Sequence, residues 1–208
     1  MKLTLVTLYD NGFASIGDQC ARSMRAHAGA MSADVFVYTS LIDPALHPSW
    51  NKLLAIRAQL ALMQPGDWAT WIDADCVVVR PFPLRDDLED KHYYDLLVSQ
   101  DHNGLCMGVF AAKACPWTLK FIDTLLFCMD VRSDDAYGAG CGPKWEQNAV
   151  KALLAEFPAT NRHVSFLDKA WVEYPWLDLE RLHPIHHLGG LAVEERLRIL
   201  RTYPYGVA

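Results

Sequence analysis

The chain has 208 residues, of which 51% are hydrophobic and 21% are charged, and its net charge is −6 at pH 7. This composition is typical of a globular chain with a substantial core. The negative charge and the lack of a basic block argue against a nucleic-acid partner. The sequence shows no internal repeat and no linker, so we expect one domain over residues 1–208.

Features that would direct the chain to a membrane or out of the cell are weak. The apolar run after Lys2 is too short and too interrupted for a signal peptide. No stretch approaches the ~20 apolar residues of a membrane span. The six cysteines are scattered without a C-x-x-C pair, which is typical of free thiols in a reducing compartment. We therefore expect a cytoplasmic protein without a transmembrane segment.

Strands and helices are predicted to alternate from the N-terminus. The branched residues of Leu3–Leu8 indicate a buried strand, and Ser15 is placed to cap the helix that follows. A second strand is expected at Val35–Thr39. Apolar residues at helical spacing predict a helix over Trp50–Met63, with Ser49 as its N-cap. This order of elements is how nucleotide-binding α/β domains begin.

The segment Trp71–Val79 is predicted to be one strand that carries two carboxylates, Asp73 and Asp75. Burial of two neighbouring carboxylates is costly unless a cation compensates their charge. Oxygen ligands suit Mn²⁺ or Mg²⁺, which keep positions open for substrate phosphates. Because ligands of open α/β sheets gather at the carboxyl ends of strands, this D-x-D is a candidate site for a metal that holds a diphosphate. The alternative is that both side chains only end the strand.

The second half of the chain continues the alternation. Residues 85–91 form a charged segment, predicted to be a solvated loop or a short helix, and the glycine-rich residues 133–142 predict a surface loop or a mobile lid. The other elements expected are strands at Asp95–Ser99, Leu105–Ala112 and Arg162–Leu167, and helices at Trp117–Met129, Pro143–Glu156 and Ala192–Arg201.

Six short motifs stand in an order that resembles one enzyme family. They are V-T-L-Y-D-N-G-F-A from Val6, W-N-K-L from Trp50, W-I-D-A-D from Trp71, G-L-C-M-G-V-F from Gly104, W-E-Q-N from Trp145 and H-H-L-G from His186. The chain resembles the metal-dependent, nucleotide-sugar-using glycosyltransferases of the GT-A fold. It is similar to the glycogenin and lipopolysaccharide-galactosyltransferase group and to related galactosyl- and xylosyltransferases. The resemblance implies an α/β fold, with a single Rossmann-like domain and a mostly parallel central sheet flanked by helices.

The resemblance also implies a reaction and a metal. A sugar would pass, with retention of configuration, from a nucleotide-diphosphate sugar, UDP-sugar foremost, to a glycan or other hydroxyl acceptor. Mn²⁺ or Mg²⁺ would be held by Asp73, Asp75 and His186, where the H-x-x-G spacing selects His186 over His187. A structural histidine near a turn is the alternative for either ring.

Further motif residues gain roles from the resemblance. The donor would contact Leu8, Tyr9, Asn11, Lys52, Asp73 and Gly189. The catalytic residue would be Gln147 at the reacting face of the sugar, with Glu146 as its ionisable alternative. Outside the six motifs, Asp101 is a further candidate, to hold sugar hydroxyls. Simpler alternatives exist: Lys52 as a solvated surface residue, Glu146 as a complement to a helix dipole, and Asp101 as a turn residue. The aromatic residues Trp171, Tyr174 and Trp176 would stack an acceptor sugar or belong to the core.

Two departures from the family pattern matter. Cys106-Met107 replaces the usual Asn-Thr or Asn-Ser, which puts one sugar contact in doubt. No Lys-Pro-Trp follows Gly189, so diphosphate binding is expected to depend more on the metal and on Lys52.

Two other classes of protein compete with this hypothesis. Phosphatases of the haloacid-dehalogenase type also use a D-x-D at a strand end, which would make Asp73 the nucleophile and Asp75 the acid/base. Their motif normally lies near the N-terminus and continues into a small residue and Thr, unlike Cys76-Val77 here. A non-catalytic sugar-binding domain would keep the aromatic cluster without needing the D-x-D.

Overall fold

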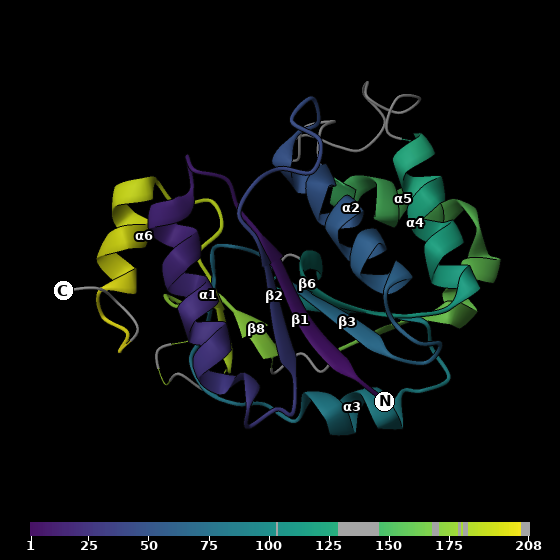
Figure 1. The fold of residues 1–208 in the computed structure, drawn as a ribbon, viewed down its shortest axis with the longest axis horizontal. Coiled ribbons are helices and arrows are strands. Elements are labelled where there is room, and N and C mark those ends of the chain that lie inside the picture. Colours follow the sequence, from purple (N-terminus) through teal and green to yellow (C-terminus); the bar gives the residue numbers. More distant parts are fainter. Residues whose placement is uncertain (103, 129–145, 168–170, 179, 181–182, 205–208) are drawn as a thin grey trace.

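Figure 1 shows the computed structural model, which describes residues 1–102, 104–128, 146–167, 171–178, 180 and 183–204. Its centre is a six-stranded sheet with the order β2-β1-β3-β6-β5-β7. The strands are β1 (Leu3–Leu8), β2 (Asp34–Tyr38), β3 (Trp68–Ile72), β5 (Leu96–Asp101), β6 (Gly104–Lys113) and β7 (Val164–Phe166). Within this sheet β6 runs against both of its neighbours and the other five strands share one direction. The prediction of a mostly parallel α/β sheet is therefore confirmed.

Helices cover both faces of the sheet, and because successive side chains of a strand point to opposite faces, each strand contributes to both cores. On one face, Val6 and Trp71 pack beneath the helices α2 (Pro48–Ala61), α4 (Pro116–Cys128) and α5 (Glu146–Glu156). On the other face, Leu5 and Ile72 pack towards α1 (Ala14–Ala28) and α3 (Leu84–Asp90). Figure 1 shows the first group of helices gathered on one side of the sheet and α1 on the other.

A small second sheet extends the α1 side of the molecule. Its order is β4-β9-β8, with β4 (Cys76–Val78), β9 (Ile185–His187) and β8 (Val172–Glu173). The last helix, α6 (Val193–Leu200), packs on α1 through a cluster that includes Ile16 and Leu200. This packing brings the last part of the described chain next to the D-x-D segment.

Several boundaries differ from the sequence predictions. The predicted single strand Trp71–Val79 is two strands in different sheets, β3 and β4, with Asp73 and Asp75 in the turn between them. Neither Ser15 nor Ser49 is an N-cap. Phe13 precedes α1 without a side-chain cap, and His47 caps α2 by accepting a hydrogen bond from the Ser49 N–H at 3.2 Å.

Other elements lie where the sequence predicted them, within a few residues. The charged segment at 85–91 is the short helix α3, and Pro116 is the first residue of α4. A 3-10 helix at Pro158–His163 takes the first part of the predicted late strand. The predicted loop at 133–142 and the predicted start of a helix at Pro143 lie outside the described residues. Among the helices that the structure describes, none is both long and apolar enough to cross a membrane.

Candidate active site

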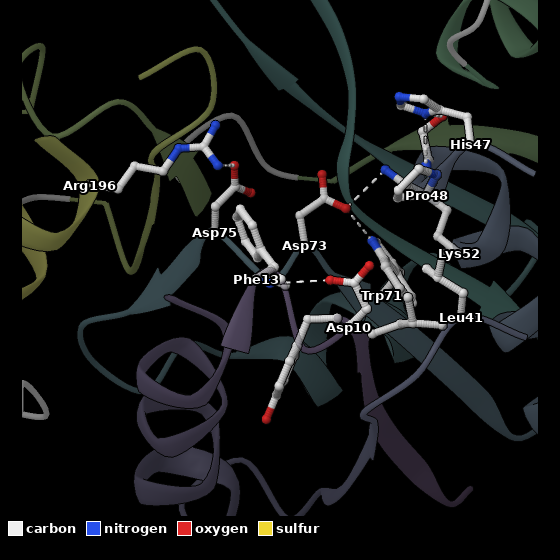
Figure 2. Close-up of a pocket in the computed structure, with 15 residues that line it drawn as sticks. Asp10, Phe13, Leu41, His47, Pro48, Lys52, Trp71, Asp73, Asp75 and Arg196 are labelled. Carbon is white, nitrogen blue, oxygen red and sulfur yellow. Dashed lines mark hydrogen bonds and ion pairs between the residues drawn. The ribbon is translucent and has the colours of Figure 1, made fainter. Parts of the chain in front are cut away.

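A cavity of about 360 Å³ opens at the edge of the sheet where β1 and β3 end (Figure 2). Ligand sites of α/β sheets are found at this edge, and the volume lies in the usual range for small-molecule pockets. Five of the residues expected to bind donor or metal line this cavity together: Leu8, Tyr9, Lys52, Asp73 and Asp75. The sequence motifs from the first 80 residues therefore converge in space.

The turn that carries the D-x-D is held by the backbone of its neighbours. The Asp73 N–H donates to the carbonyl of Gly108 on β6 at 2.8 Å, and the Leu188 N–H donates to the carbonyl of Asp75 at 2.9 Å. These bonds connect the turn to β6 and to the end of β9. The turn is thus fixed from two sides, which orients both carboxylates.

Lys52 is buried, and its ammonium lies between two carboxylates. Its Nζ lies 2.9 Å from Oδ1 of Asp73 and 2.8 Å from Oε1 of Glu146, and it donates to the carbonyl of Met107 at 3.1 Å. Burial acts to lower the pKa of Lys52, but Asp73 and Glu146 outweigh it and raise this pKa well above its ordinary value. The solvated-lysine alternative is therefore wrong, and Lys52 is a buried cation that positions Asp73.

Asp73 is positioned through one of its two oxygens. The indole Nε1 of Trp71 donates to Oδ1 of Asp73 at 2.6 Å, and Lys52 contacts the same oxygen. Figure 2 shows both interactions meeting at this atom. The carboxylate is held in one orientation at the floor of the cavity.

His187, and not His186, lies beside the D-x-D. The Nε2 of His187 is 3.6 Å from Oδ1 of Asp75. His186 is buried on the opposite face of β9, where its Nε2 is 2.9 Å from Oδ2 of Asp178 and its Nδ1 is hydrogen-bonded to the hydroxyl of Tyr203. The structure does not bring His186 to the site, because neighbouring residues of a strand point in opposite directions.

The H-x-x-G spacing also fits His187 and Gly190. Gly190 has a φ of +78°, a conformation that favours glycine. Gly189, expected to bind the donor, packs against the imidazole instead, and a Cβ there would lie 2.7 Å from Nε2 of His187. Gly189 thus positions the ring of His187. The H-x-x-G pattern, if applied to His187 and Gly190 in place of His186 and Gly189, would have selected His187.

The second nitrogen of His187 faces a thiol and a carboxylate. Its Nδ1 is 3.9 Å from Sγ of Cys106, and ligand atoms of Asp101, Cys106 and His187 all lie within 4.8 Å of one another. Burial acts to lower the pKa of His187, but Asp75 and Cys106 raise it well above its ordinary value. The imidazole therefore lies between Asp75 on one side and the Cys106–Asp101 pair on the other.

A bulge in β6 brings the G-L-C-M-G-V-F motif to the site. The pairing of β5 with β6 shifts between Val98 and Ser99, so that Val98 pairs with Phe110 and Ser99 with Cys106. Bulges of this kind redirect side chains and are frequent next to active sites. The N–H of Met107, which lies in the bulge, donates to Oε1 of Gln147 at 2.9 Å. Gln147 is thereby fixed beside the motif at the start of α5.

Arg196 is a residue of the cavity that the sequence analysis did not identify. Its Nη1 is 3.4 Å from Oδ2 of Asp75, and its guanidinium lies over the ring of Phe13, 5.4 Å from the centroid. Burial acts to raise the pKa of Asp75, but His187 and Arg196 lower it below its ordinary value. Arg196 lies in an amphipathic helix with Glu194 and Glu195 before it, a pattern that predicts only a solvated face.

Of two other predicted donor contacts, Tyr9 lines the cavity and Asn11 does not. Tyr9 is buried and donates a hydrogen bond from its hydroxyl to Oδ1 of Asp18 at 2.5 Å; burial and this bond raise the pKa of Tyr9 to about 12. Asn11 is exposed in the turn after β1 and is not among the residues that line the cavity.

A second, polar cavity of about 510 Å³ lies on the Asp101 side of the site. It is lined by Gln100, Asp101, His102, Gly104, Glu173 and His183. Tyr174 stacks on His187 with 5.5 Å between ring centroids, and Trp176, 43% exposed, packs on Tyr174 at 4.7 Å. Trp171 is buried against Phe82, so it belongs to the core, which was one of the two predicted roles for the aromatic residues. Asp101 and Asp75 thus lie on opposite sides of His187, each next to a cavity.

Comparison with known families identifies the chain. Residues 83–203, more than half of it, match the galactosyl transferase GMA12/MNN10 family. The chain belongs to this family. Its sequence is 30% identical over 98 residues to galactomannan galactosyltransferase 1 of Cyamopsis tetragonoloba, and 25% identical over 122 residues to glycosyltransferase 6 of Arabidopsis thaliana. These alignments cover 43% and 52% of the chain but only 22% and 28% of the two relatives.

Solved structures share the fold. A glycosyltransferase involved in glycosylation of the major capsid of PBCV-1 superposes with a TM-score of 0.74 at 13% identity, covering 97% of this chain and 100% of that one. The galactosyltransferase LgtC, solved with donor and acceptor sugar analogs, gives a TM-score of 0.58 at 13% identity, covering 97% and 96%. The fold of this family member is therefore that of GT-A glycosyltransferases, as the motifs implied. Neither comparison supports the phosphatase alternative.

Proposed function

We propose that this chain is a nucleotide-sugar-dependent glycosyltransferase that binds its donor, a UDP-sugar foremost, in the 360 Å³ cavity. The observation that carries the proposal is the convergence of Lys52, Asp73 and Asp75 at the carboxyl edge of the sheet, with His187 behind Asp75. Family membership supports the reaction class. The acceptor would be a hydroxyl of a glycan or of another molecule.

The residues at the site fit a divalent cation. Asp75 and His187 offer a carboxylate oxygen and an imidazole nitrogen 3.6 Å apart, with Asp73 two residues away on the same turn. Such mixed oxygen and nitrogen donors suit Mn²⁺, and Mg²⁺ is the alternative. When bound, the ion would offset the charge that develops on the departing diphosphate. His187 replaces His186 in this proposed ligand set.

The chain's own residues provide orientation. Trp71 and Lys52 hold Asp73 from one side, which leaves its carboxylate suited to the ribose or to a metal-bound water. The Met107 N–H donates to Oε1 of Gln147 and fixes this side chain beside the G-L-C-M-G-V-F motif. The resemblance to the family is what assigns the amide of Gln147 to the reacting face of the sugar. An amide is a weak nucleophile, which favours retention by displacement on one face of the sugar over a covalent intermediate. Glu146 is committed to Lys52 and acts through it.

The acceptor would approach from the Asp101 side. The cavity there is lined by carboxylates, imidazoles and an amide. The exposed Trp176 packs on Tyr174, whose ring contacts His102 of that lining. Sugar hydroxyls bind such polar groups and sugar rings stack on aromatic faces. In this arrangement donor and acceptor cavities lie on the two sides of His187.

Thermal unfolding tests the proposal. Mn²⁺ with UDP should raise the melting temperature, and Asp75→Asn should abolish the rise. Asp123→Asn, which alters an exposed ion pair with Arg57, should leave the rise unchanged. A screen of nucleotide sugars for Mn²⁺-dependent hydrolysis would then identify the donor. Hydrolysis of a generic phosphomonoester without a response to UDP would contradict the proposal, and metal-independent binding of free sugar alone would favour the sugar-binding domain.

A further inference from the structure

Arg196 occupies a position in the donor cavity that its present partners do not explain. Helix α6 is held against α1 by apolar side chains including Ile16, Cys20 and Leu200, which fixes the backbone that carries Arg196. Figure 2 shows its guanidinium reaching the D-x-D turn from the side opposite Lys52. The cavity therefore has a cation at each end of the carboxylate pair.

The contacts of this guanidinium leave part of it unsatisfied. A guanidinium carries five N–H donors in a planar fork. The contact with Asp75 is 3.4 Å long, whereas hydrogen bonds between charged partners are normally about 2.7–2.9 Å. The Nε of Arg196 is buried and has no hydrogen-bond partner among the described residues. A buried charged donor without a partner is costly and points to a missing acceptor.

The two cations differ in what they can offer a ligand. The ammonium of Lys52 already has three oxygen neighbours, from Asp73, Glu146 and Met107. Arg196 has one carboxylate neighbour in these contacts, and Asp75 is also the residue proposed to bind the metal. A divalent ion at Asp75 would draw away the negative charge that now faces Arg196. The fork would then need a new anion with several oxygens.

We propose that Arg196 binds the diphosphate of the donor, exchanging Asp75 for phosphate oxygens when a divalent ion takes Asp75. This inference rests on the proposed function, because it assumes that a nucleoside diphosphate occupies the cavity. Arginine pairs with phosphate through two parallel hydrogen bonds, which its planar fork favours. In the absence of metal and donor, Arg196 neutralises Asp75.

The exchange predicts effects of opposite sign on two ligands. Loss of Arg196 removes a competitor for Asp75, so Mn²⁺ alone should bind at least as tightly as before. The same loss removes a phosphate contact, so UDP should bind more weakly. Uridine has no phosphate, and its affinity should change little. A residue that only supported the fold would weaken all three ligands together.

The experiment compares Arg196→Gln with Arg198→Gln by titration calorimetry. Arg198 lies on the same helix but is exposed and pairs with Glu195, which makes it a matched control. Mn²⁺ is titrated first, and UDP, UMP and uridine then follow at saturating Mn²⁺. For Arg196→Gln we expect unchanged or tighter Mn²⁺ binding, UDP binding at least about tenfold weaker, and uridine binding within about threefold. Arg196→Lys should recover part of the UDP affinity, and Arg198→Gln should match the wild type throughout.

The outcomes separate the two proposals. If the wild type binds UDP and Arg196→Gln binds it equally well, the inference is wrong and the proposed function stands. Equal weakening of Mn²⁺, UDP and uridine in Arg196→Gln would show a structural role and overturn the inference as well. If the wild type binds no UDP in the presence of Mn²⁺, the proposed function fails and this inference fails with it.

Discussion

Two adjacent histidines show how strongly one position changes the role of a side chain. His186 is enclosed by Asp178 and Tyr203, whereas His187 faces Asp75 and Cys106. Their direction follows from the alternation of side chains in β9, which pairs with β4 so that His186 stands opposite Val77. The two rings are chemically alike and differ only in their surroundings.

Substitution of each histidine should therefore affect a different property. His187→Asn should weaken Mn²⁺ binding at least about tenfold, because it removes a proposed ligand. His186→Asn should lower the free energy of unfolding by about 3 kcal/mol, because it disturbs the buried partners of the ring, and should retain Mn²⁺ binding in the folded protein. Calorimetry with Mn²⁺ and chemical denaturation measure the two effects. The reverse pattern would restore His186 as the ligand.

The buried cation Lys52 should be important for stability as well as for the site. Lys52→Met would leave Asp73 and Glu146 without their cation, at a cost of about 3–5 kcal/mol in the free energy of unfolding. Lys2→Met serves as the control, because its pair with Asp34 is exposed and such pairs contribute about 0–1 kcal/mol. Chemical denaturation of both variants tests this contrast, and equal losses would contradict it.

The pH dependence of the Lys52 variant has a definite sign. In the wild type the raised pKa of Lys52 keeps the ammonium charged, so its stabilisation is present below the ordinary lysine pKa and is lost only as the pH rises beyond it. Lys52→Met lacks this titrating group, so its deficit in the free energy of unfolding relative to the wild type depends on the charge of the ammonium. The deficit should therefore stay constant below the ordinary lysine pKa and shrink as the pH rises beyond it, and a deficit that grows there would be inconsistent with this account.

At the residue scale, the sequence predicted those residues of the candidate site that belong to the ordered motifs. Asp73, Asp75 and Lys52, which the sequence predicts as donor or metal contacts, line one cavity. They could be predicted because a strand end and a helix start can be recognised from the local sequence. Arg196 was missed because its role depends on the packing of α6 against α1, which no local pattern encodes. The sequence could not decide which histidine faces the D-x-D, because H-x-x-G fits two registers and pairing with β4 determines which ring points to Asp75.

The sequence predicts the type of most helices and strands correctly and their boundaries less well. The run from Trp71 to Val79 is apolar on both sides of the D-x-D, since β3 and β4 are both buried, and periodicity cannot show that the chain changes sheets between them. The bulge in β6 leaves no sequence mark beyond Gly104 and Gly108. Both features depend on pairing between distant segments, and both determine where the site lies.

Two glycines, Gly108 in β6 and Gly189 in the turn after β9, should control the position of His187. A Cβ at Gly189 would lie 2.7 Å from its Nε2, and a Cβ at Gly108 would lie 3.1 Å from its Cε1. The two alanine variants should weaken Mn²⁺ binding about tenfold, with a loss of about 1–3 kcal/mol in the free energy of unfolding from overpacking. Gly29→Ala is the control, because a Cβ there meets nothing within 4 Å. Wild-type Mn²⁺ affinity in Gly189→Ala would show that the imidazole is not held by this contact.

Two cavities of the molecule lie near His187, because its neighbour Asp75 lines one of them and its neighbour Asp101 lines the other. The N-terminal strands and α2 form the cavity assigned to the donor, and the ends of β5 and β8 contribute to the polar cavity. Asp75 and Asp101, which follow or end different strands, meet across His187 although 26 positions separate them in the sequence. A reaction that joins two substrates needs this kind of arrangement, with each substrate bound by different segments.

This division predicts that the acceptor side can be altered without loss of donor binding. Trp176→Ala removes an exposed ring next to the polar cavity, and it should weaken binding of neutral oligosaccharides about fivefold, the typical contribution of one aromatic contact. Mannohexaose and cellohexaose are suitable probes, because both present uncharged sugar hydroxyls and ring faces. Their binding is measured by NMR titration with UDP and Mn²⁺ present.

Phe127→Ala is the matched control, since Phe127 is exposed at the end of α4 and lines neither cavity. Both variants should keep wild-type affinity for UDP with Mn²⁺, because Trp176 does not line the donor cavity. Donor hydrolysis without an acceptor should also stay unchanged. Loss of UDP binding in Trp176→Ala would show that the two cavities are one site, and oligosaccharide binding that is unaffected by Trp176→Ala would place the acceptor elsewhere.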